Sequence, residues 1–480
     1  MTLSVNGDAT YEGQKWYAVV GDEVAEGIVE NGVVAFTGIG RVSTGTKVKV
    51  YCDRKEDAST IGIATYQWGD DEAPVELNYT AQVMTTLAVL PSVDIGYKYY
   101  KSGEQFRIPA IAKGKNVTIA LYDARPYADD LGVAQSVIGS YSPIDIAGNV
   151  STNSGTTWSA PKILIDVPNC FDCMSGVVNN ASGAPSGASD LGDVCLTYDP
   201  EVDKFFVIGI TGGGLSARNS SDVAGSWDCV MYTRGGGVED EFADRRSIKA
   251  ELLSGLSKLG VTTTFSGTNG ILAGPGHGMV TKVTNSGRLV VPMQYFGPDG
   301  TRVFAAYSDD HGASWQVTKL APSGYNSQEN SIVELDDGSW YMIAKKGGGH
   351  SQSGRHLLHS TDFVNWTYLG EFTPSSSVQG SILKLGKNSS GQSRYAMAFD
   401  TSGGAGTNIT QARYDLRLYF GTDDTSNSGT IRWDTENYLP IFVGSTGAKG
   451  YNSMILIDDN HLGILFEANG HIYFRKCTWE

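Results

Sequence analysis

The octapeptides Ser151-Thr-Asn-Ser-Gly-Thr-Thr-Trp158 and Ser308-Asp-Asp-His-Gly-Ala-Ser-Trp315 follow one pattern. Each has serine first, Asn or Asp third, Gly fifth and Trp eighth. The third side chain can accept hydrogen bonds from N–H groups of its own turn, and glycine supplies the positive φ of a tight turn. The tryptophan then folds back as an apolar plug beneath the turn. The repetition predicts a fold built from repeated β-hairpins.

Shorter or interrupted versions of the pattern occur at Ser360-Thr-Asp-Phe-Val-Asn-Trp366 and at Gly421-Thr-Asp-Asp424, which is followed by Trp433. The pattern resembles the Asp-box of sialidases and related β-propellers. Asp-boxes are structural features of propeller blades and take no part in catalysis. The resemblance therefore implies a fold, and the catalytic residues have to be sought elsewhere in the chain.

The composition agrees with an all-β fold. The 480 residues include 60 glycines, and only 18% of the chain is charged, which is typical of many strands joined by tight turns. Short apolar segments such as Val117-Thr-Ile-Ala-Leu-Tyr122 recur with turn residues between them. We expect a six-bladed β-propeller at residues 96–480, preceded by a small β-rich module at residues 1–95. For this module we hypothesise a carbohydrate-binding or attachment role.

One stretch departs from the β pattern. From Glu239 to Leu259, apolar residues fall at helical spacing before Gly260. We expect a helix there, inserted between two blades.

The formal net charge of −16 argues against nucleic acid or an anionic membrane as a partner, because both would repel the protein. An acidic enzyme that acts on an acidic sugar needs locally placed arginines. We expect no signal peptide, because the N-terminal residues have neither its basic region nor its apolar region, and no apolar run reaches the roughly 20 residues that span a bilayer. We expect an extracellular or cell-surface location.

No metal or cofactor is expected. The seven histidines are scattered without zinc-type spacing, and His277 and His311 are expected to be structural. Cys170-Phe-Asp-Cys173 is a lone CxxC pair and therefore a weak zinc signal.

The segment Phe106-Arg107-Ile108-Pro109 precedes the first Asp-box. It resembles the motif that opens the sialidase catalytic domain, and the resemblance implies that Arg107 belongs to an arginine triad that binds the sugar carboxylate. A guanidinium group suits this task because it offers two parallel donors and stays charged.

The stretch Tyr122-Asp-Ala-Arg-Pro-Tyr-Ala-Asp-Asp130 is similar to the family segment that ends at the catalytic acid/base. The match implies that Asp130 protonates the leaving oxygen and then deprotonates the incoming water, with Asp129 as the alternative. It also assigns Arg125 to substrate binding.

The family's catalytic glutamate maps to Glu329, while Glu334 is a competing candidate that we expect to face solvent. The segment from Gly450 to Glu467 resembles the family's nucleophile segment and implies that Tyr451 is the nucleophile. A sialic acid carries a carboxylate on its anomeric carbon, so an anionic nucleophile would be repelled. A phenol approaches neutral and is activated by a base, here Glu329.

The other triad positions match less well. Arg413 fits one of them best, with Arg417 as the alternative. At the third position the family has arginine and this chain has Lys345, unless Arg355 in the following loop supplies the charge. Lysine keeps the charge and loses the two-donor geometry, which leaves the identity of the sugar open.

The resemblance covers residues 96–480. It implies a cofactor-independent exo-α-sialidase that retains anomeric configuration through a tyrosyl-enzyme intermediate and acts on sialylated glycans or related acidic sugars. The alternatives are a hydrolase of a related nonulosonic acid such as Kdn, another propeller enzyme acting on acidic glycans, and a sialoglycan-binding protein without activity. A binding protein needs no acid, base and nucleophile, so the three candidates Asp130, Glu329 and Tyr451 argue against the last alternative.

Overall fold

The structure is a computed structural model. It describes residues 2–4, 13, 15–20, 23–31, 33–36, 47–52, 60–65, 75–76, 84–88, 106–125, 144–166, 171–172, 177–178, 191–211, 227–265, 269–347, 354–373, 378–388, 390–401, 415–424, 426, 429–443, 450–468 and 471–479. The Cys170 and Cys173 pair lies outside these residues.

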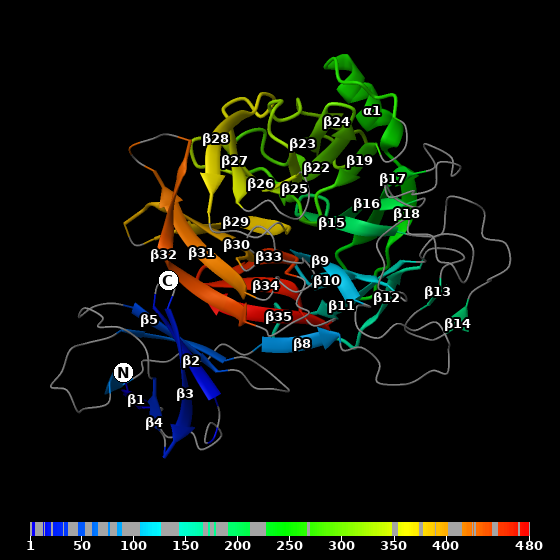
Figure 1. The fold of residues 1–480 in the computed structure, drawn as a ribbon. Coiled ribbons are helices and arrows are strands. Elements are labelled where there is room, and N and C mark those ends of the chain that lie inside the picture. The colour runs from blue at the N-terminus through cyan, green and yellow to red at the C-terminus, as the bar shows by residue number, and fades with distance from the viewer. Residues whose placement is uncertain are drawn as a thin grey trace.

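Within the described residues, six antiparallel sheets, each with a core of four strands, form the blades of a propeller (Figure 1). The first three blades are β9–β12 (Phe106–Lys113, Thr118–Ala124, Asp145–Ser151, Lys162–Ile165), β15–β18 (Leu191–Asp199, Lys204–Thr211, Asp228–Gly235, Ala243–Ser247) and β19 with β22–β24 (Gly270–Ala273, Leu289–Gly297, Gly300–Ser308, Gln316–Val317). The next two are β25–β28 (Ser327–Glu334, Trp340–Lys346, Arg355–Ser360, Thr367–Phe372) and β29–β32 (Gly380–Lys387, Ser393–Asp400, Asp415–Asp423, Ile431–Val443). The last joins β33–β35 (Asn452–Asp458, His461–Ala468, His471–Thr478) to β8 (Met84–Ala88). The predicted all-β class and six-bladed propeller are confirmed.

The blades close into a ring. Strands near the centre contact one another in the cyclic order β9, β15, β22, β25, β29, β33 and back to β9. Two short strands, β20 (Gly276–His277) and β21 (Met279–Val280), pair with β15 and β22 respectively. The last blade takes its outer strand, β8, from before the first blade in sequence. A strand that precedes the first blade in sequence thus completes the last blade.

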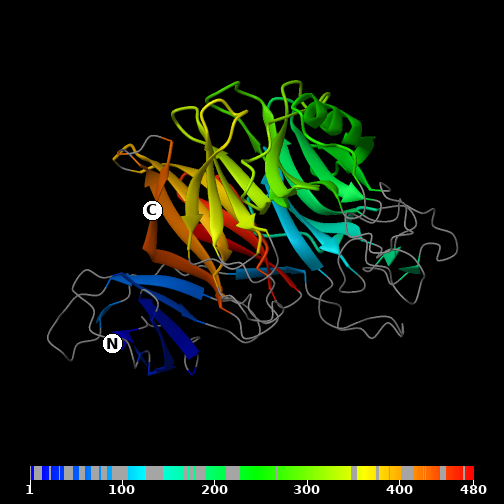
Figure 2. The same ribbon diagram turned by 45° about the horizontal axis from the view of Figure 1, so that its top comes forward.

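Seven N-terminal strands form a separate sheet in the order β6-β5-β2-β3-β4-β1-β7. In Figures 1 and 2 this sheet, drawn in blue, lies beside the blade of β32, and β5 contacts β32. Because β8 belongs to the last blade, part of the predicted module 1–95 contributes to the propeller. The division of the chain at residue 95 stays a prediction. The strands of the sheet are β1 (Thr2–Ser4), β2 (Lys15–Val20), β3 (Glu23–Glu30), β4 (Val33–Ala35), β5 (Lys47–Cys52), β6 (Thr60–Thr65) and β7 (Val75–Glu76), and a further pair is β13 (Phe171–Asp172) with β14 (Val177–Val178).

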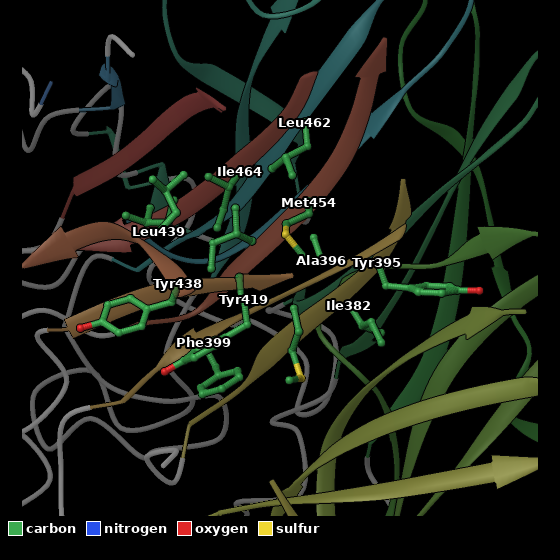
Figure 3. Packing of buried hydrophobic residues seen from close by; sticks show 14 of the residues in the cluster. Ile382, Tyr395, Ala396, Phe399, Tyr419, Tyr438, Leu439, Met454, Leu462 and Ile464 are labelled. Carbon is green, nitrogen blue, oxygen red and sulfur yellow. The ribbon is translucent and has the colours of Figure 1, made fainter. Parts of the chain in front are cut away.

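The apolar core lies between the blades. Every residue of β10 is buried, which requires cover on both faces of its sheet. The largest cluster joins the last three blades through side chains such as Tyr341, Phe399 and Met454. Figure 3 shows part of this cluster, with Phe399 and Met454 among the labelled residues. Within it the rings of Phe399 and Tyr419 stack with their centroids 5.2 Å apart. Each blade therefore depends on its two neighbours for burial.

Both complete Asp-boxes make the same hydrogen bonds. The Gly155 N–H donates to Ser151 Oγ at 2.9 Å, and the Gly312 N–H donates to Ser308 Oγ at 2.8 Å. The two glycines have φ of +84° and +81°, as the turn requires. Each box joins the third and fourth strands of its blade, and so does the shorter box at 360–366. The boxes thus lie at the outer edge of the ring.

The tryptophans of the two boxes differ in burial. Trp315 is 4% exposed, whereas Trp158 is half-buried and makes an edge-to-face contact with Phe474 at 5.0 Å. We expected both to be buried. Helix α1 (Lys249–Lys258) explains the difference, since its Leu252 and Leu256 pack in the same cluster as Trp315. Among the described residues, Trp158 has no helix over it.

The helix is shorter than expected. We predicted residues 239–259, and α1 covers Lys249–Lys258 between two blades. The preceding residues Ala243–Ser247 form β18, because pairing with β17 satisfies their backbone groups. The helix ends before Gly260, which has φ of +77°. No helix among the described residues has the length and apolar character needed to cross a membrane.

The difference in cover predicts a difference in stability. Trp315→Ala should lower the free energy of unfolding by about 3–5 kcal/mol, since it leaves a cavity beneath α1. Trp158→Ala should cost clearly less, because part of that side chain is already in water. Urea unfolding followed by circular dichroism measures both, and equal losses would contradict this explanation.

Candidate active site

The candidate site lies where the inner strands of several blades begin. Arg107 is the second residue of β9, Glu329 is the third residue of β25, and Tyr451 directly precedes β33. These residues come from three blades and from sequence positions more than 100 residues apart. Side-chain contacts between them bring the three strand ends together.

Glu329 and Tyr451 are in direct contact, as expected from the sequence. The Tyr451 hydroxyl donates a hydrogen bond to Oε1 of Glu329. Glu329 has φ of +33° and lies where the register between β25 and β26 shifts. A bulge with positive φ redirects one side chain out of the regular alternation of a strand. This local distortion aims the Glu329 carboxylate at the tyrosine.

Arg107 is held by a carboxylate from the last blade. Its Nε and Nη2 donate to the two oxygens of Glu467 at 3.2 and 3.1 Å. The Ile108 N–H donates to the same carboxylate at 2.9 Å, and Ile108 has φ of +57°. The Arg107 guanidinium carbon lies 5.3 Å from the centre of the Tyr451 ring. Glu467 thus fixes the arginine beside the proposed nucleophile.

Lys345 contacts the candidate base. Its Nζ lies 3.0 Å from Oε2 of Glu329, and the two side chains are 11% and 14% exposed. Lys345 pairs across the sheet with Gln328, the neighbour of Glu329, so strand register brings the ammonium to the carboxylate. Lys345, where the chain departs from the family pattern, therefore lies against the candidate base and keeps a small exposed surface.

Arg355 does not lie in a loop, contrary to our expectation. It is the first residue of β27, pairs across the sheet with Lys345 and has no exposed surface. Burial lowers the pKa of Arg355 to about 9, while the nearby Glu329 and Asp400 act in the opposite direction, so the group is charged at neutral pH. A fully buried side chain presents no surface for a ligand to contact.

Arg125 is likewise buried, with 1% exposure. Its Nε and Nη2 donate to Oδ2 of Asp123 at 3.1 and 2.6 Å, and Asp193 lies 3.6 Å away. Asp123 is paired in register with Arg107 on β9. Burial raises the pKa of Asp123 to about 6, although Arg125 and Arg107 lower it. The pair forms a buried layer behind Arg107.

Three predicted residues lie outside the described residues: the acid/base candidate Asp130, its alternative Asp129, and Arg413. The alternative to Arg413 is described. Arg417 lies on β31 and donates through Nε to Asp415 at 2.8 Å, with its guanidinium 4.1 Å from the centre of the Tyr438 ring.

The expectation that Glu334 faces solvent is wrong. It is 3% exposed, and its two oxygens accept hydrogen bonds from the N–H groups of residues 282–284 at 2.7, 3.0 and 2.7 Å. It lies at the opposite end of β25 from the bulge at Glu329. Its carboxylate holds a loop together, which leaves Glu329 as the candidate for the general base.

Two residues of the site received no role from the sequence. Glu467 closes the Gly450–Glu467 segment, but nothing local indicates that its partner is Arg107. Gln379 lies beneath the site, and only the assembled fold places it against the strand that follows Tyr451. Both contacts join blades that are distant in sequence.

His277 and His311 bond to protein groups. The half-buried His277 ring bonds to Ser453 Oγ and to the Ile382 carbonyl, each at 3.1 Å, and loss of contact with water lowers its pKa to about 4. His311 lies 2.9 Å from Asp199. In the described part of the chain, no group of His, Cys, Asp and Glu side chains is arranged to hold a metal ion.

The chain has relatives among known proteins. No family model matches the chain. A sialidase from Clostridium perfringens is 26% identical over 398 residues, covering 78% of this chain and 90% of the relative.

The chain is similar to sialidases in sequence and in fold. A Hadza microbial sialidase, Hz136, superposes with a TM-score of 0.64 at 16% identity and covers 99% of this chain and 92% of its own. The intramolecular trans-sialidase from Ruminococcus gnavus gives 0.57 at 17% identity over 80% of this chain and 98% of its own.

The raised pKa of Asp123 predicts a pH dependence of stability. Folding raises the pKa of this carboxyl from 3.8 to about 6, so its protonated form favours the folded state. The contribution of Asp123 to the free energy of unfolding is therefore fully present below pH 3.8 and is lost as the pH rises through about 6. Two pKa units correspond to about 3 kcal/mol. Unfolding free energies of the wild type and Asp123→Asn, measured from about pH 4 to about pH 7, should therefore converge or cross as the wild type loses stability. Parallel curves would contradict this assignment.

Proposed function

We propose that this protein is an exo-α-sialidase that hydrolyses terminal sialic acids with retention through a tyrosyl-enzyme intermediate. The contact between the Tyr451 hydroxyl and Glu329 is the observation that carries the proposal. A general base has to reach the proton that it removes, and this one does. The neighbouring Arg107 and Lys345 supply positive charge for an acidic sugar.

In the first step, the phenol oxygen of Tyr451 attacks the anomeric carbon while Glu329 takes the phenol proton. Asp130 donates a proton to the glycosidic oxygen, which leaves with the bonding electron pair. In the second step, Asp130 takes a proton from water, whose oxygen attacks the anomeric carbon. Tyr451 then leaves and recovers its proton from Glu329. Two inversions at one carbon give net retention.

The sugar carboxylate is assigned to Arg107, Lys345 and Arg413. The first is held by Glu467 in a fixed orientation, which lowers the ordering cost of binding. Arg125 and Arg355 are buried, and we assign them to support of the pocket from behind. Lys345 has to contact both Glu329 and the sugar carboxylate, since its ammonium already lies against the base.

The fate of the intermediate distinguishes hydrolysis from transfer. If water attacks, the product is free sialic acid. If a hydroxyl of the bound sugar attacks instead, the product is an anhydro sugar that is lighter by one water. The structural likeness to an intramolecular trans-sialidase makes the second outcome the competing proposal, and mass spectrometry of the product separates the two.

The function is tested with a fluorogenic α-sialoside beside its Kdn analogue. We expect turnover of the sialoside, and Tyr451→Phe should lower kcat by about a hundredfold or more, because the attacking oxygen is removed. Tyr395→Phe is the matched control, since Tyr395 also donates to a carboxylate, that of Asp423 at 2.8 Å, and its ring packs in a different apolar cluster from that of Tyr451. Turnover of the Kdn analogue alone would mean that the substrate is a Kdn glycoside and not a sialoside. Equal loss of activity in Tyr451→Phe and Tyr395→Phe would contradict the role proposed for Tyr451.

Lys345 offers a second test. Lys345→Met should reduce kcat/KM by about tenfold, because a charge-assisted contact is lost. Lys345→Arg should keep or improve it, since a guanidinium restores the family geometry. The neighbouring Lys346→Met is the control, because that ammonium pairs with Glu371 at 3.0 Å. Equal effects of the two methionine variants would show that Lys345 contributes nothing specific.

A further inference from the structure

We infer that Gln379 is a positioning residue for the nucleophile Tyr451, within a support formed by Val378-Gln379-Gly380. This inference rests on the proposed function and concerns the floor of the same site. The three residues lead into β29, and the first two are fully or almost fully buried. Val378 contacts Tyr451, Gln379 contacts Asn452, and Gly380 leaves room for Arg355.

Gln379 holds the main chain of Asn452, the residue after the nucleophile. The Asn452 N–H donates to Oε1 of Gln379 at 3.0 Å, and Nε2 of Gln379 donates to the Asn452 carbonyl at 2.9 Å. The same Nε2 donates to the Pro275 carbonyl at 3.1 Å. One side chain thereby satisfies both main-chain groups of Asn452 as a neighbouring strand would. Gln379 is 1% exposed, so it acts through Tyr451 and does not touch the sugar.

The side chain of Asn452 is held as well. The hydroxyl of Ser381 donates to its Oδ1, and its Nδ2 donates to the Ala398 and Gly450 carbonyls, each at 3.3 Å. Asn452 has no exposed surface. Blade β29–β32 and the residue before it therefore hydrogen-bond to both the main chain and the side chain of Asn452.

Val378 and Gly380 complete the support. The Val378 side chain packs with Ile108 and the Tyr451 ring in one apolar cluster. The Val378 carbonyl accepts a hydrogen bond from Nη2 of Arg355 at 2.6 Å. A Cβ at Gly380 would lie 2.8 Å from the guanidinium carbon of Arg355, so only glycine leaves room for this arginine. The Arg355 guanidinium also lies 4.7 Å from the centre of the Phe399 ring.

These contacts determine where the phenol oxygen lies. A tyrosine side chain has two main torsions, so its hydroxyl follows from the main-chain position and the packing of its ring. Gln379 fixes the main-chain position through Asn452, and Val378 fixes the packing of the ring. A shift of about 1 Å at a reacting atom can cost about a hundredfold in rate. We therefore expect loss of Gln379 to affect the chemical step and leave sugar binding largely unchanged.

The test compares Gln379→Met with Gln294→Met. The methionine keeps the length of the side chain and removes its hydrogen bonds. Gln294 is a matched control, because it is 2% exposed and also donates to a main-chain carbonyl, that of Ala273 at 2.9 Å, without touching Asn452 or Tyr451. On the fluorogenic sialoside, Gln379→Met should lower kcat by about tenfold or more with KM changed less than about threefold. Gln294→Met should keep the kcat of the wild type.

Hydrogen exchange provides a readout that does not depend on activity. The Asn452 amide should exchange faster in Gln379→Met than in the wild type, because its acceptor is gone. If the wild type fails to turn over the sialoside, the proposed function fails, and this exchange still tests the support. Unchanged exchange at Asn452, or equal kcat in the two methionine variants, overturns the inference.

Gln379→Glu is the second variant, in case the methionine variant does not fold. It keeps an acceptor for the Asn452 N–H but, when ionised, has no donor for the carbonyls of Asn452 and Pro275. Its kcat relative to the wild type should be reduced at neutral pH and should recover as the pH falls, since a protonated carboxyl donates again. A ratio that stays near one at all pH values overturns the inference.

Discussion

Each blade of this propeller buries both faces of its sheet, and it can do so only if a neighbour lies on each side. The first and last blades meet that requirement by closing the ring, with β8 pairing to β35 and β9 contacting β33. The ion pair of Arg107 and Glu467 lies at this closure and joins residues 360 positions apart in sequence. Assembly of the pocket therefore depends on closure of the ring, since its side chains come from blades at both ends of the chain.

The pocket of this acidic protein is organised by paired charges. Arg107 faces Glu467, Lys345 faces Glu329, and Arg125 faces Asp123. Removing a charge from water is costly unless a partner is close, so burial and pairing occur together here. The pairing has a second effect, because Arg107 and Lys345 are already oriented before a ligand arrives. Such preorganisation reduces the cost of binding an acidic sugar.

Local distortion and rigid support also coincide at the site. Ile108 and Glu329 both have positive φ, which costs about 1–3 kcal/mol at a residue other than glycine. Strain of that size persists only where the surroundings hold the backbone firmly. The cluster of Ile108, Val378 and Tyr451 provides such surroundings beneath the pocket. The same contacts that tolerate the strain hold the phenol in position, which is why we regard Val378-Gln379-Gly380 as part of the machinery.

Features that depend on residues close together in the chain could be predicted from the sequence. The Asp-box turns are short-range hydrogen-bond patterns, and the segments around Arg107, Glu329 and Tyr451 are short motifs, so all of them can be recognised from the order of the residues alone. The folded chain was needed to show that Glu467 is the partner of Arg107, that Arg355 is buried in a strand, and that residues 243–247 form β18 instead of a helix. These outcomes depend on which strands and blades become neighbours. A local pattern specifies a turn or a strand, but the partner of a side chain is chosen by ring closure and strand register, which bring together residues far apart in the chain.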